Sequence, residues 1–463
     1  MAWVALVALV GPDARAAGGA YRQGKHGNPT TGVLRLQSEP RGECVHCHQM
    51  HGSYQGNRTG PYPYLLFAPN DNSLCFSCHA IPAANLIYQG QLLYGQSAHA
   101  TASSNVWPGP APPARSSSDR GFCLTCHSPH GVRDASGVVP SLLHTREEAL
   151  CTACHDGSPA ARDVRTQFQK PYRHPIQYTG IHAESEGGDP ASYAVSPTNR
   201  RHAECVDCHN PHYLRANVAA PTAPDASNRL LATGRVRVQN GAAGTVPLYT
   251  YVGPGDVAFA REYELCFKCH SSWTAQPPGQ RNEAVLFNPA NPSFHPVESA
   301  GRNANIPAGA FSNGWAWNRT VYCTDCHSSD DPGVRGPHGS TYRFILARSY
   351  TNSSTVPQSM ASTDLCFACH QYDVYANPTS ASATKALSRF NAPQQTQGHT
   401  FHVGTRQVAC FSCHESHGST LYPALMAVGR TPVGLTSYSQ TTGGGTCWST
   451  CHGSTSYTVN YAR

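Results

Sequence analysis

The chain has 463 residues, of which Asp, Glu, Lys and Arg make up only 13%, against about 25% in typical globular domains. Its formal net charge is +6, and glycine and proline reach 41 and 36 copies. This composition argues against long helices and strands and gives no support to nucleic-acid binding, and residues 107–113 and 441–445 are expected to be irregular.

The N-terminus predicts an export signal. Residues 2–10 form a short apolar run before the small-residue site Ala14-Arg15-Ala16, so we expect a signal peptide over 1–16, although the usual positive n-region is missing. No later segment approaches the length of a transmembrane helix, and no cysteine precedes Cys44 to carry a lipid anchor. We therefore expect an exported protein, extracellular or at the cell surface, with the periplasm as the alternative.

All 20 cysteines fall into ten pairs, and a histidine follows each pair. Nine pairs have the spacing Cys-x-x-Cys-His, and the tenth, CWSTCH, has one more residue between its cysteines. The cysteines are Cys44, Cys47, Cys75, Cys78, Cys123, Cys126, Cys151, Cys154, Cys205, Cys208, Cys266, Cys269, Cys323, Cys326, Cys366, Cys369, Cys410, Cys413, Cys447 and Cys451.

This spacing predicts covalent haem attachment. The two sulfurs add to the two vinyl groups of one porphyrin, and the imidazole of the next residue coordinates the iron as its proximal ligand. Structural zinc and a disulfide framework also use paired cysteines, but neither needs a histidine after every pair. We expect ten haem c groups, with proximal ligands His48, His79, His127, His155, His209, His270, His327, His370, His414 and His452.

A low-spin electron-transfer haem needs a second axial ligand. The chain has 25 histidines, which leaves fifteen beyond the proximal ten, whereas methionine occurs four times. We therefore expect histidine on both faces of each haem. The distal candidates are His26, His51, His99, His130, His174, His212, His295, His338, His399, His402 and His417.

These candidates recur with the motifs, which group in twos. A follower histidine comes after the first motif of each pair, at His51, His130, His212, His338 and His417. An upstream histidine precedes each pair, at His26, His99, His174, His295 and either His399 or His402. The pattern divides the chain into five two-haem modules of one continuous wire, residues 17–95, 96–165, 166–280, 281–385 and 386–463.

A follower histidine cannot share a haem with the motif just before it. Three residues span at most roughly 10 Å, so His48 and His51 cannot lie on opposite faces of one haem. We expect each follower to bind the other haem of its own module. Among the remaining histidines, His46 and His144 are expected to be exposed or hydrogen-bonded to haem propionates, whereas His182 and His202 are left open as ligands.

The expected fold class is mostly irregular coil with short α-helices and few strands, in an elongated protein whose core is a stacked haem chain. No stretch between motifs is long enough for an independent core. Ten oxidised haems would each add two propionates and one positive charge, which changes the net charge to roughly −4.

The repeated module, His...Cys-x-x-Cys-His-x-x-His-Gly...Leu-Cys-x-x-Cys-His, resembles the doubled-motif multihaem cytochromes of metal-reducing prokaryotes. Within that group the loop-rich, weakly charged chain is similar to the subunits of extracellular cytochrome nanowires. The resemblance implies bis-histidine haems in alternating parallel and T-shaped pairs, and head-to-tail filaments in which the adjacent subunit completes one haem. It also implies contact with other multihaem cytochromes or a porin–cytochrome complex, and with acceptors such as metal oxides or partner cells.

The arm over residues 17–31 suggests which histidine crosses the subunit boundary. It is glycine-rich, carries His26 and, if extended, spans up to roughly 60 Å. We expect His26 to ligate a haem of the neighbouring subunit, in a contact that propagates an open filament. The alternative is that His26 ligates a haem of its own first module.

Other functions remain open. A monomeric decahaem shuttle, periplasmic or threaded through a porin, has overlapping requirements, although the long stretches after His209 and His270 suit an insulating sheath better. A lipid-anchored surface decahaem protein would need large strand domains between haem clusters. A multihaem reductase would need an open iron position, and here every motif ends in histidine, so we do not expect an enzyme.

Overall fold

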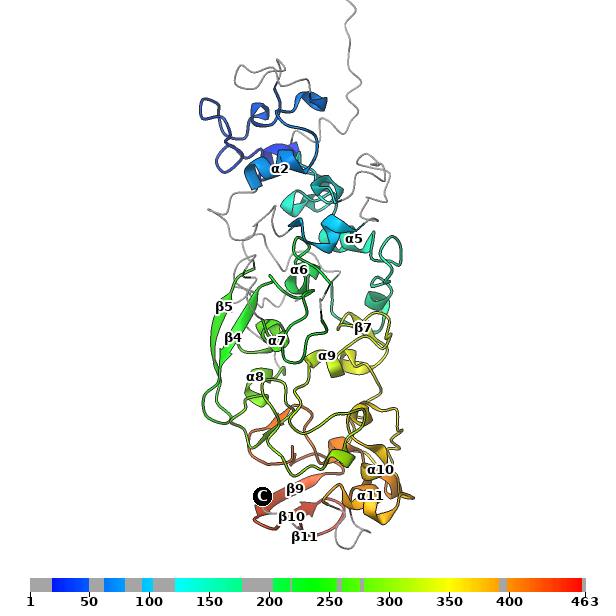
Figure 1. Ribbon diagram of the computed structural model, residues 1–463. Coiled ribbons are helices and arrows are strands. Elements are labelled where there is room, and N and C mark those ends of the chain that lie inside the picture. The colour runs from blue at the N-terminus through cyan, green and yellow to red at the C-terminus, as the bar shows by residue number, and fades with distance from the viewer. Residues whose placement is uncertain are drawn as a thin grey trace, which may run out of the picture.

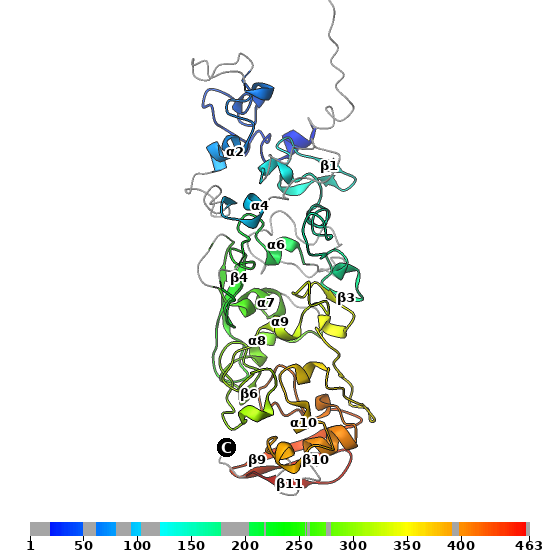
Figure 2. The same cartoon turned by 45° about the vertical axis from the view of Figure 1, so that its right-hand side comes forward.

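The computed structural model of the chain is elongated, and its modules follow one another from end to end in sequence order (Figure 1). It describes residues 19–49, 62–79, 94–102, 121–176, 203–216, 219–254, 256, 260–274, 279–390 and 398–459. The predicted signal peptide, the irregular stretch at 107–113, His51, His182 and His202 lie outside these residues. Rotation by 45° leaves the same order from α2 to β11 (Figure 2).

Helices are short throughout the described part of the chain, as expected from the glycine and proline content. The longest that can be given bounds, α7, has nine residues. The α-helices are α2 (Asn72–His79), α4 (Ala98–Thr101), α5 (Glu147–Thr152), α6 (Cys205–Cys208), α7 (Glu262–His270), α8 (Glu283–Leu286), α9 (Cys323–Cys326), α10 (Tyr372–Tyr375) and α11 (Ser382–Ala386). Single 3-10 turns cover Cys44–His46, Pro63–Leu65, Cys123–Thr125, Pro140–Leu142, Gln167–Gln169, Ala308–Ala310, Arg343–Ile345, Leu365–Ala368 and Cys410–Ser412, and one π turn covers Phe401–Thr405.

Strands form small antiparallel sheets. They are β1 (Arg133–Asp134), β2 (Gly137–Val138), β3 (Tyr172–Arg173), β4 (Arg235–Gln239), β5 (Leu248–Val252), β6 (Ser293–Phe294), β7 (Gly339–Ser340), β8 (Gly418–Ser419), β9 (Leu435–Thr441), β10 (Gly444–Ser449) and β11 (Thr455–Thr458). The pairs are β1–β2, β3–β7, β4–β5 and β6–β8, and β9–β10–β11 is a three-stranded meander. The expectation of irregular structure at 441–445 was wrong, because this segment is the turn of the β9–β10 hairpin, with Thr441 opposite Gly444.

Nine of the ten motifs lie on a helix or a helical turn. The second cysteine and the histidine of such a motif are three and four residues beyond the first cysteine, so all three side chains share one face of the turn. The amide of His48 donates to the carbonyl of Cys44 at 2.8 Å, and the same contact recurs at the other short turns. The spacing that the sequence repeats is therefore the spacing of one helical turn.

Two of the sheets join successive modules. Strand β3, just before His174, pairs with β7, just after His338, and β6, before His295, pairs with β8, after His417. The glycine after the follower histidine makes this close pairing possible, because a Cβ on Gly418 would lie 1.8 Å from the carbonyl oxygen of Leu286. The glycine of the His-x-x-His-Gly pattern is thus required by backbone contact between modules.

Protein side chains also build local cores. The β4–β5 hairpin, which lies in the long stretch after His209, packs on α7, and Val236, Phe267 and Phe287 are its buried centre. Met360, Phe367 and Val403 centre a second cluster. Because Phe267 belongs to the next motif and Phe287 lies beyond it, the hairpin packs against the next motif rather than forming a core of its own. No helix within the described segments is both long and apolar enough to span a membrane.

Gly418→Ala is expected to destabilise the protein. The new methyl group would overlap the carbonyl of Leu286 at the end of α8, which is held in place by a hydrogen bond from the side-chain amide of Asn291 at 2.9 Å. Overpacking of this kind costs roughly 1–3 kcal/mol, so the variant should unfold at lower temperature in a calorimetric scan. Gly443→Ala is the control, because a Cβ there meets nothing within 4 Å. Equal melting temperatures for the two variants would contradict the assignment.

Candidate functional site

One continuous cavity of about 5880 Å³ runs through the described part of the molecule. All 20 cysteines of the motifs line it, together with the ten histidines that follow them. Shared among ten motifs, the volume is about 590 Å³ each, within the range of roughly 300–1,000 Å³ of a pocket for one small ligand. The cysteines within this part of the chain are free thiols rather than disulfides.

Each proximal histidine faces a second histidine across this cavity. The ring centroids of the ten pairs lie between 5.9 and 6.5 Å apart. The pairs are His26–His79, His48–His130, His99–His155, His127–His212, His174–His270, His209–His338, His295–His370, His327–His417, His399–His414 and His402–His452.

This separation fits two axial ligands of one metal ion. A histidine nitrogen binds a metal at roughly 2 Å and lies about 1 Å from its ring centroid, so two imidazoles on opposite faces of one ion have centroids about 6 Å apart. Two thiols from the same motif stand beside each pair, as attachment to one porphyrin requires. The residues therefore fit ten haem c groups, with the sulfurs as attachment points and the two imidazoles as axial ligands.

The pairs follow a rule that the sequence did not reveal. Each upstream histidine faces the second motif of its own module, as His99 faces His155. Each described follower instead faces the first motif of the preceding module, as His130 faces His48. The expectation that followers bind within their own module was therefore wrong; at His338 and His417, strand pairing holds the follower against the module before it.

The fifth module departs from this rule, because both of its motifs face histidines from its own upstream segment. His399 faces the first motif at His414, and His402 faces the second at His452. Both histidines thus have a partner, where the sequence suggested that one of the two would be spare.

The arm that carries His26 is folded back on its own chain. Residues 19–23 are helical. The amide of Gly24 donates to the carbonyl of Ala20 at 2.8 Å, and the amide of Asn28 donates to the carbonyl of Gly24 at 3.1 Å, so the turns continue beyond the helix. His26 consequently faces His79, with 6.0 Å between ring centroids. The arm is thus folded rather than extended, and within the single chain His26 takes the place that the alternative gave it, in the first module. Ligation of a haem in a neighbouring subunit stays a prediction.

Five proximal histidines are oriented by a backbone turn that the motif search missed. The first-motif histidine of each module donates its Nδ1 hydrogen to a later carbonyl: His48 to Tyr64 at 2.8 Å, His127 to Ser141 at 3.0 Å, His209 to Arg229 at 3.0 Å, His327 to Phe344 at 2.8 Å and His414 to Ala424 at 2.9 Å. Such a contact fixes the tautomer, so that Nε2 is left to bind metal.

The turn itself is strained in four of the modules. Two consecutive non-glycine residues have positive φ, for example 61° at Tyr64 and 57° at Leu65. This conformation costs of order 1–3 kcal/mol per residue and persists only where its surroundings impose it. A repeated sequence signal marks these turns, which read PYLL, PSLL, RFIL and PALM, with NRLL as the counterpart in the third module.

The upstream histidines have a matching arrangement. His99 donates from Nδ1 to the carbonyl of Pro211 at 2.9 Å, and His174 donates to that of Pro337 at 2.7 Å. Each acceptor immediately precedes the follower histidine of the next module, which itself faces a different site. One short segment therefore positions ligands of two sites at once.

Burial favours the neutral form of many of the paired imidazoles. It lowers the pKa of His26, His212 and His370 to about 4, assisted in each case by a neighbouring imidazole. A neutral imidazole is the form that binds a metal ion.

Two histidines outside the pairs have a structural role instead. His46 is only 1% exposed and donates from Nε2 to the carbonyl of Pro40 at 2.8 Å, and His144 donates from Nε2 to the carbonyl of Leu124. Both histidines thus bond backbone carbonyls, rather than being exposed or reserved for haem propionates.

Contacts between sulfurs give the spatial order of the motifs. The first cysteine of each second motif lies within hydrogen-bonding reach of the first cysteine of the next module, in the pairs Cys75–Cys123, Cys151–Cys205, Cys266–Cys323 and Cys366–Cys410. Within modules the second cysteines are neighbours, as Cys126 and Cys154 are. The ten sites therefore follow one another in space as they do in sequence.

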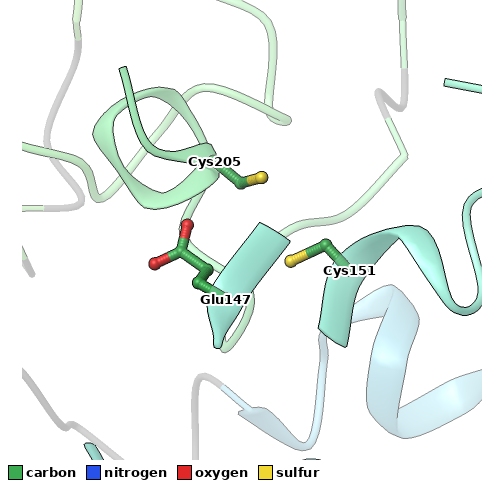
Figure 3. A group of neighbouring side chains, drawn as sticks. All are labelled: Glu147, Cys151 and Cys205. Atoms are coloured by element: carbon green, nitrogen blue, oxygen red, sulfur yellow. The ribbon is translucent and has the colours of Figure 1, made fainter. Parts of the chain in front are cut away.

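One such junction also contains a carboxylate. Glu147 and Cys151 on α5 converge with Cys205 on α6, and their ligand atoms all lie within 4.8 Å of one another (Figure 3). The group could hold a metal ion, but both sulfurs belong to haem-attachment motifs and are unavailable as thiolates once they are thioethers. Glu147 accepts a hydrogen bond from the amide of Val206 at 2.8 Å.

The tenth motif differs in its local structure. Cys447 lies on β10, and the chain leaves the strand before Cys451, so a helical turn does not set the spacing. The hydroxyl oxygen of Ser449 accepts hydrogen bonds from the backbone amides of Cys451 and His452, at 3.3 and 3.1 Å. The extra residue in CWSTCH is thus accommodated by a strand and a serine-stabilised turn.

Comparison with known proteins agrees with this geometry. A family model described as the doubled CXXCH motif matches residues 40–83, 115–160 and 318–374. The doubled motifs indicate a multihaem c-type cytochrome. Each matched stretch of this multihaem cytochrome holds two successive motifs, those of the first, second and fourth modules. No curated protein and no solved structure matches the chain.

Glu147→Gln is expected to stabilise the cytochrome at alkaline pH. Burial, with the charge of Glu204, raises the pKa of Glu147 from 4.5 to about 8. Because a raised carboxyl pKa penalises the charged form in the folded state, the parent loses stability as pH rises from 4.5 towards 8. The variant should melt at a higher temperature than the parent at pH 9 and at a similar one at pH 5. Glu39→Gln, at an exposed position, is the control, and an unchanged pH profile in Glu147→Gln would contradict the pKa assignment.

Proposed function

We propose that this cytochrome binds ten haems and conducts electrons along its length. The observation that carries the proposal is the set of ten facing histidine pairs, each beside its own two cysteines, within one chain. Haem c supplies reversible one-electron chemistry when bound. The polypeptide attaches each group through two sulfurs, holds it between two imidazoles and encloses it in the shared cavity.

Two histidines at every site also argue against an enzyme. A reductase needs an iron position open to substrate, whereas each proximal histidine of the described chain faces a second one. This supports the proposal that the protein transfers electrons without catalysing a reaction of its own. Absorbance that changes on addition of carbon monoxide to the reduced protein would contradict it.

The direction of conduction follows the long axis of the molecule. The first module lies at one end and β10, with the tenth motif, lies at the other (Figure 1). Cys44 and Cys451, in the first and last motifs, are exposed. We therefore propose that electrons enter and leave at the two ends, to extracellular acceptors or to other multihaem cytochromes.

Head-to-tail assembly into an extracellular filament would extend this path from one subunit to the next. The elongated shape and the sites at both ends support it, and an open heterologous contact would propagate it. One observation favours a monomeric shuttle instead, because every proximal histidine finds its partner within the chain, so that no second subunit is needed to complete a site. Electron microscopy of the secreted protein distinguishes filaments from monomers.

The mature protein should carry ten haems. Because each motif offers two sulfurs, intact-protein mass spectrometry should show ten haem additions to the polypeptide. Cys451→Ala should lower the count to nine or leave the tenth group attached through one sulfur. A parent protein with nine haems would show that CWSTCH is not an attachment site.

His402→Ala should convert one site to a high-spin iron. His402 faces His452 with 6.4 Å between ring centroids, and its removal leaves that site with one protein ligand. An electron paramagnetic resonance spectrum should gain a high-spin signal while the haem count stays unchanged. His144→Ala is the matched control, since His144 bonds the carbonyl of Leu124 and should leave all irons low-spin. A low-spin spectrum for His402→Ala would contradict the ligand assignment.

A further inference from the structure

One axial histidine differs from the others in its Nδ1 partner. Backbone carbonyls accept this hydrogen bond at His48, His99, His174 and His327, among others. At His417, which faces His327, the atom closest to Nδ1 is instead a carboxylate oxygen, Oε2 of Glu283, at 2.6 Å. Among the Nδ1 contacts shown by the described residues, this is the one made to a charged acceptor.

The tautomer of His417 follows from its position. Nδ1 points at Glu283, so Nε2 is the atom available to the metal shared with His327. A neutral imidazole bound through Nε2 keeps its proton on Nδ1, and Oε2 of Glu283, 2.6 Å away, is the nearest atom that can accept it. The guanidinium of Arg281 lies 3.4 Å from Nδ1. It has no acceptor atom, so it cannot accept a hydrogen bond from a protonated Nδ1.

The neighbouring charges hold Glu283 in place. Arg281 lies 3.7 Å from its Oε1 and at the same time 2.9 Å from Glu415, which Arg430 also contacts. Two carboxylates and two guanidinium groups leave the network with no net charge. Oε2 of Glu283 is thus directed at His417, and the side chain of Glu283 is 20% exposed.

We infer that Glu283 is a positioning residue that lowers the reduction potential of the site formed by His327 and His417. A carboxylate draws the Nδ1 proton further from the ring than a carbonyl does, which makes the imidazole a stronger donor to iron. A stronger donor favours the ferric state. This site would then titrate at a lower potential than sites whose histidines bond carbonyls, and would form an energetic step near the middle of the electron path. The inference rests on the proposed function.

Glu283→Gln tests it in the haem-loaded protein. Glutamine keeps the size and can still accept the hydrogen bond through its amide oxygen, but it carries no charge. In a spectroelectrochemical titration, about one tenth of the absorbance change, the share of one haem among ten, should occur at a higher potential in the variant than in the parent. In the parent this share should be the part that titrates at the lowest potential. The haem count and the low-spin spectrum should not change. An unchanged titration curve with all haems present would overturn the inference.

Glu415→Gln is the matched control. Glu415 carries the same charge in the same network but contacts Arg281 and Arg430 rather than an axial histidine. If the direct hydrogen bond sets the potential, Glu415→Gln should shift the curve much less than Glu283→Gln. Equal shifts would show that the network charge acts through space, and would overturn the role given to the hydrogen bond.

His417→Ala separates this inference from the proposed function. Loss of the ligand should give one high-spin iron, whatever the role of Glu283. If His417→Ala keeps every iron low-spin, the ligand assignment itself fails. If it gives the high-spin iron while Glu283→Gln leaves the potentials unchanged, only the inference about Glu283 fails.

Discussion

Opposed imidazole rings about 6 Å apart are the constraint on which the rest of this structure depends. The two rings of a pair come from distant parts of the chain, as His174 and His270 do, and no long helix or sheet holds them in register. Instead, a hydrogen bond from Nδ1 to a backbone carbonyl sets the orientation of each described first-motif ring, and strained turns supply several of these carbonyls. Local backbone strain is thus accepted where it places a ligand.

The same constraint explains why the modules cannot be independent domains. A module provides the proximal ligands of its two sites, but the distal ligand of its first site comes from the next module, as His212 comes to His127. The β3–β7 and β6–β8 pairings bring His338 and His417 to the module before each, and Gly339 and Gly418 allow the two backbones to approach. Each of these modules therefore completes the one before it, whereas in the fifth module His399 faces the first motif of its own module.

The sequence alone predicted the chemistry better than the connectivity. Spacing within a motif is a local property, so a single helical turn explains the cysteines and proximal histidines. Which distal histidine faces which motif depends on strand pairing between modules, which sequence spacing does not encode, and the followers were accordingly assigned to the wrong site. The arm with His26 was predicted to be extended, whereas its glycines permit tight turns as readily as extension. The long stretch after His209 forms a hairpin on α7 because its Val and Tyr residues pack in the cluster around Phe267.

A cryo-electron microscopy map of the secreted protein tests the central claim most directly. The account predicts ten porphyrin densities in sequence order along the particle, each between two histidines of the same chain, with His26 opposite His79 and His399 opposite His414. A porphyrin completed by a histidine of another subunit, or one with a single axial histidine, would contradict it.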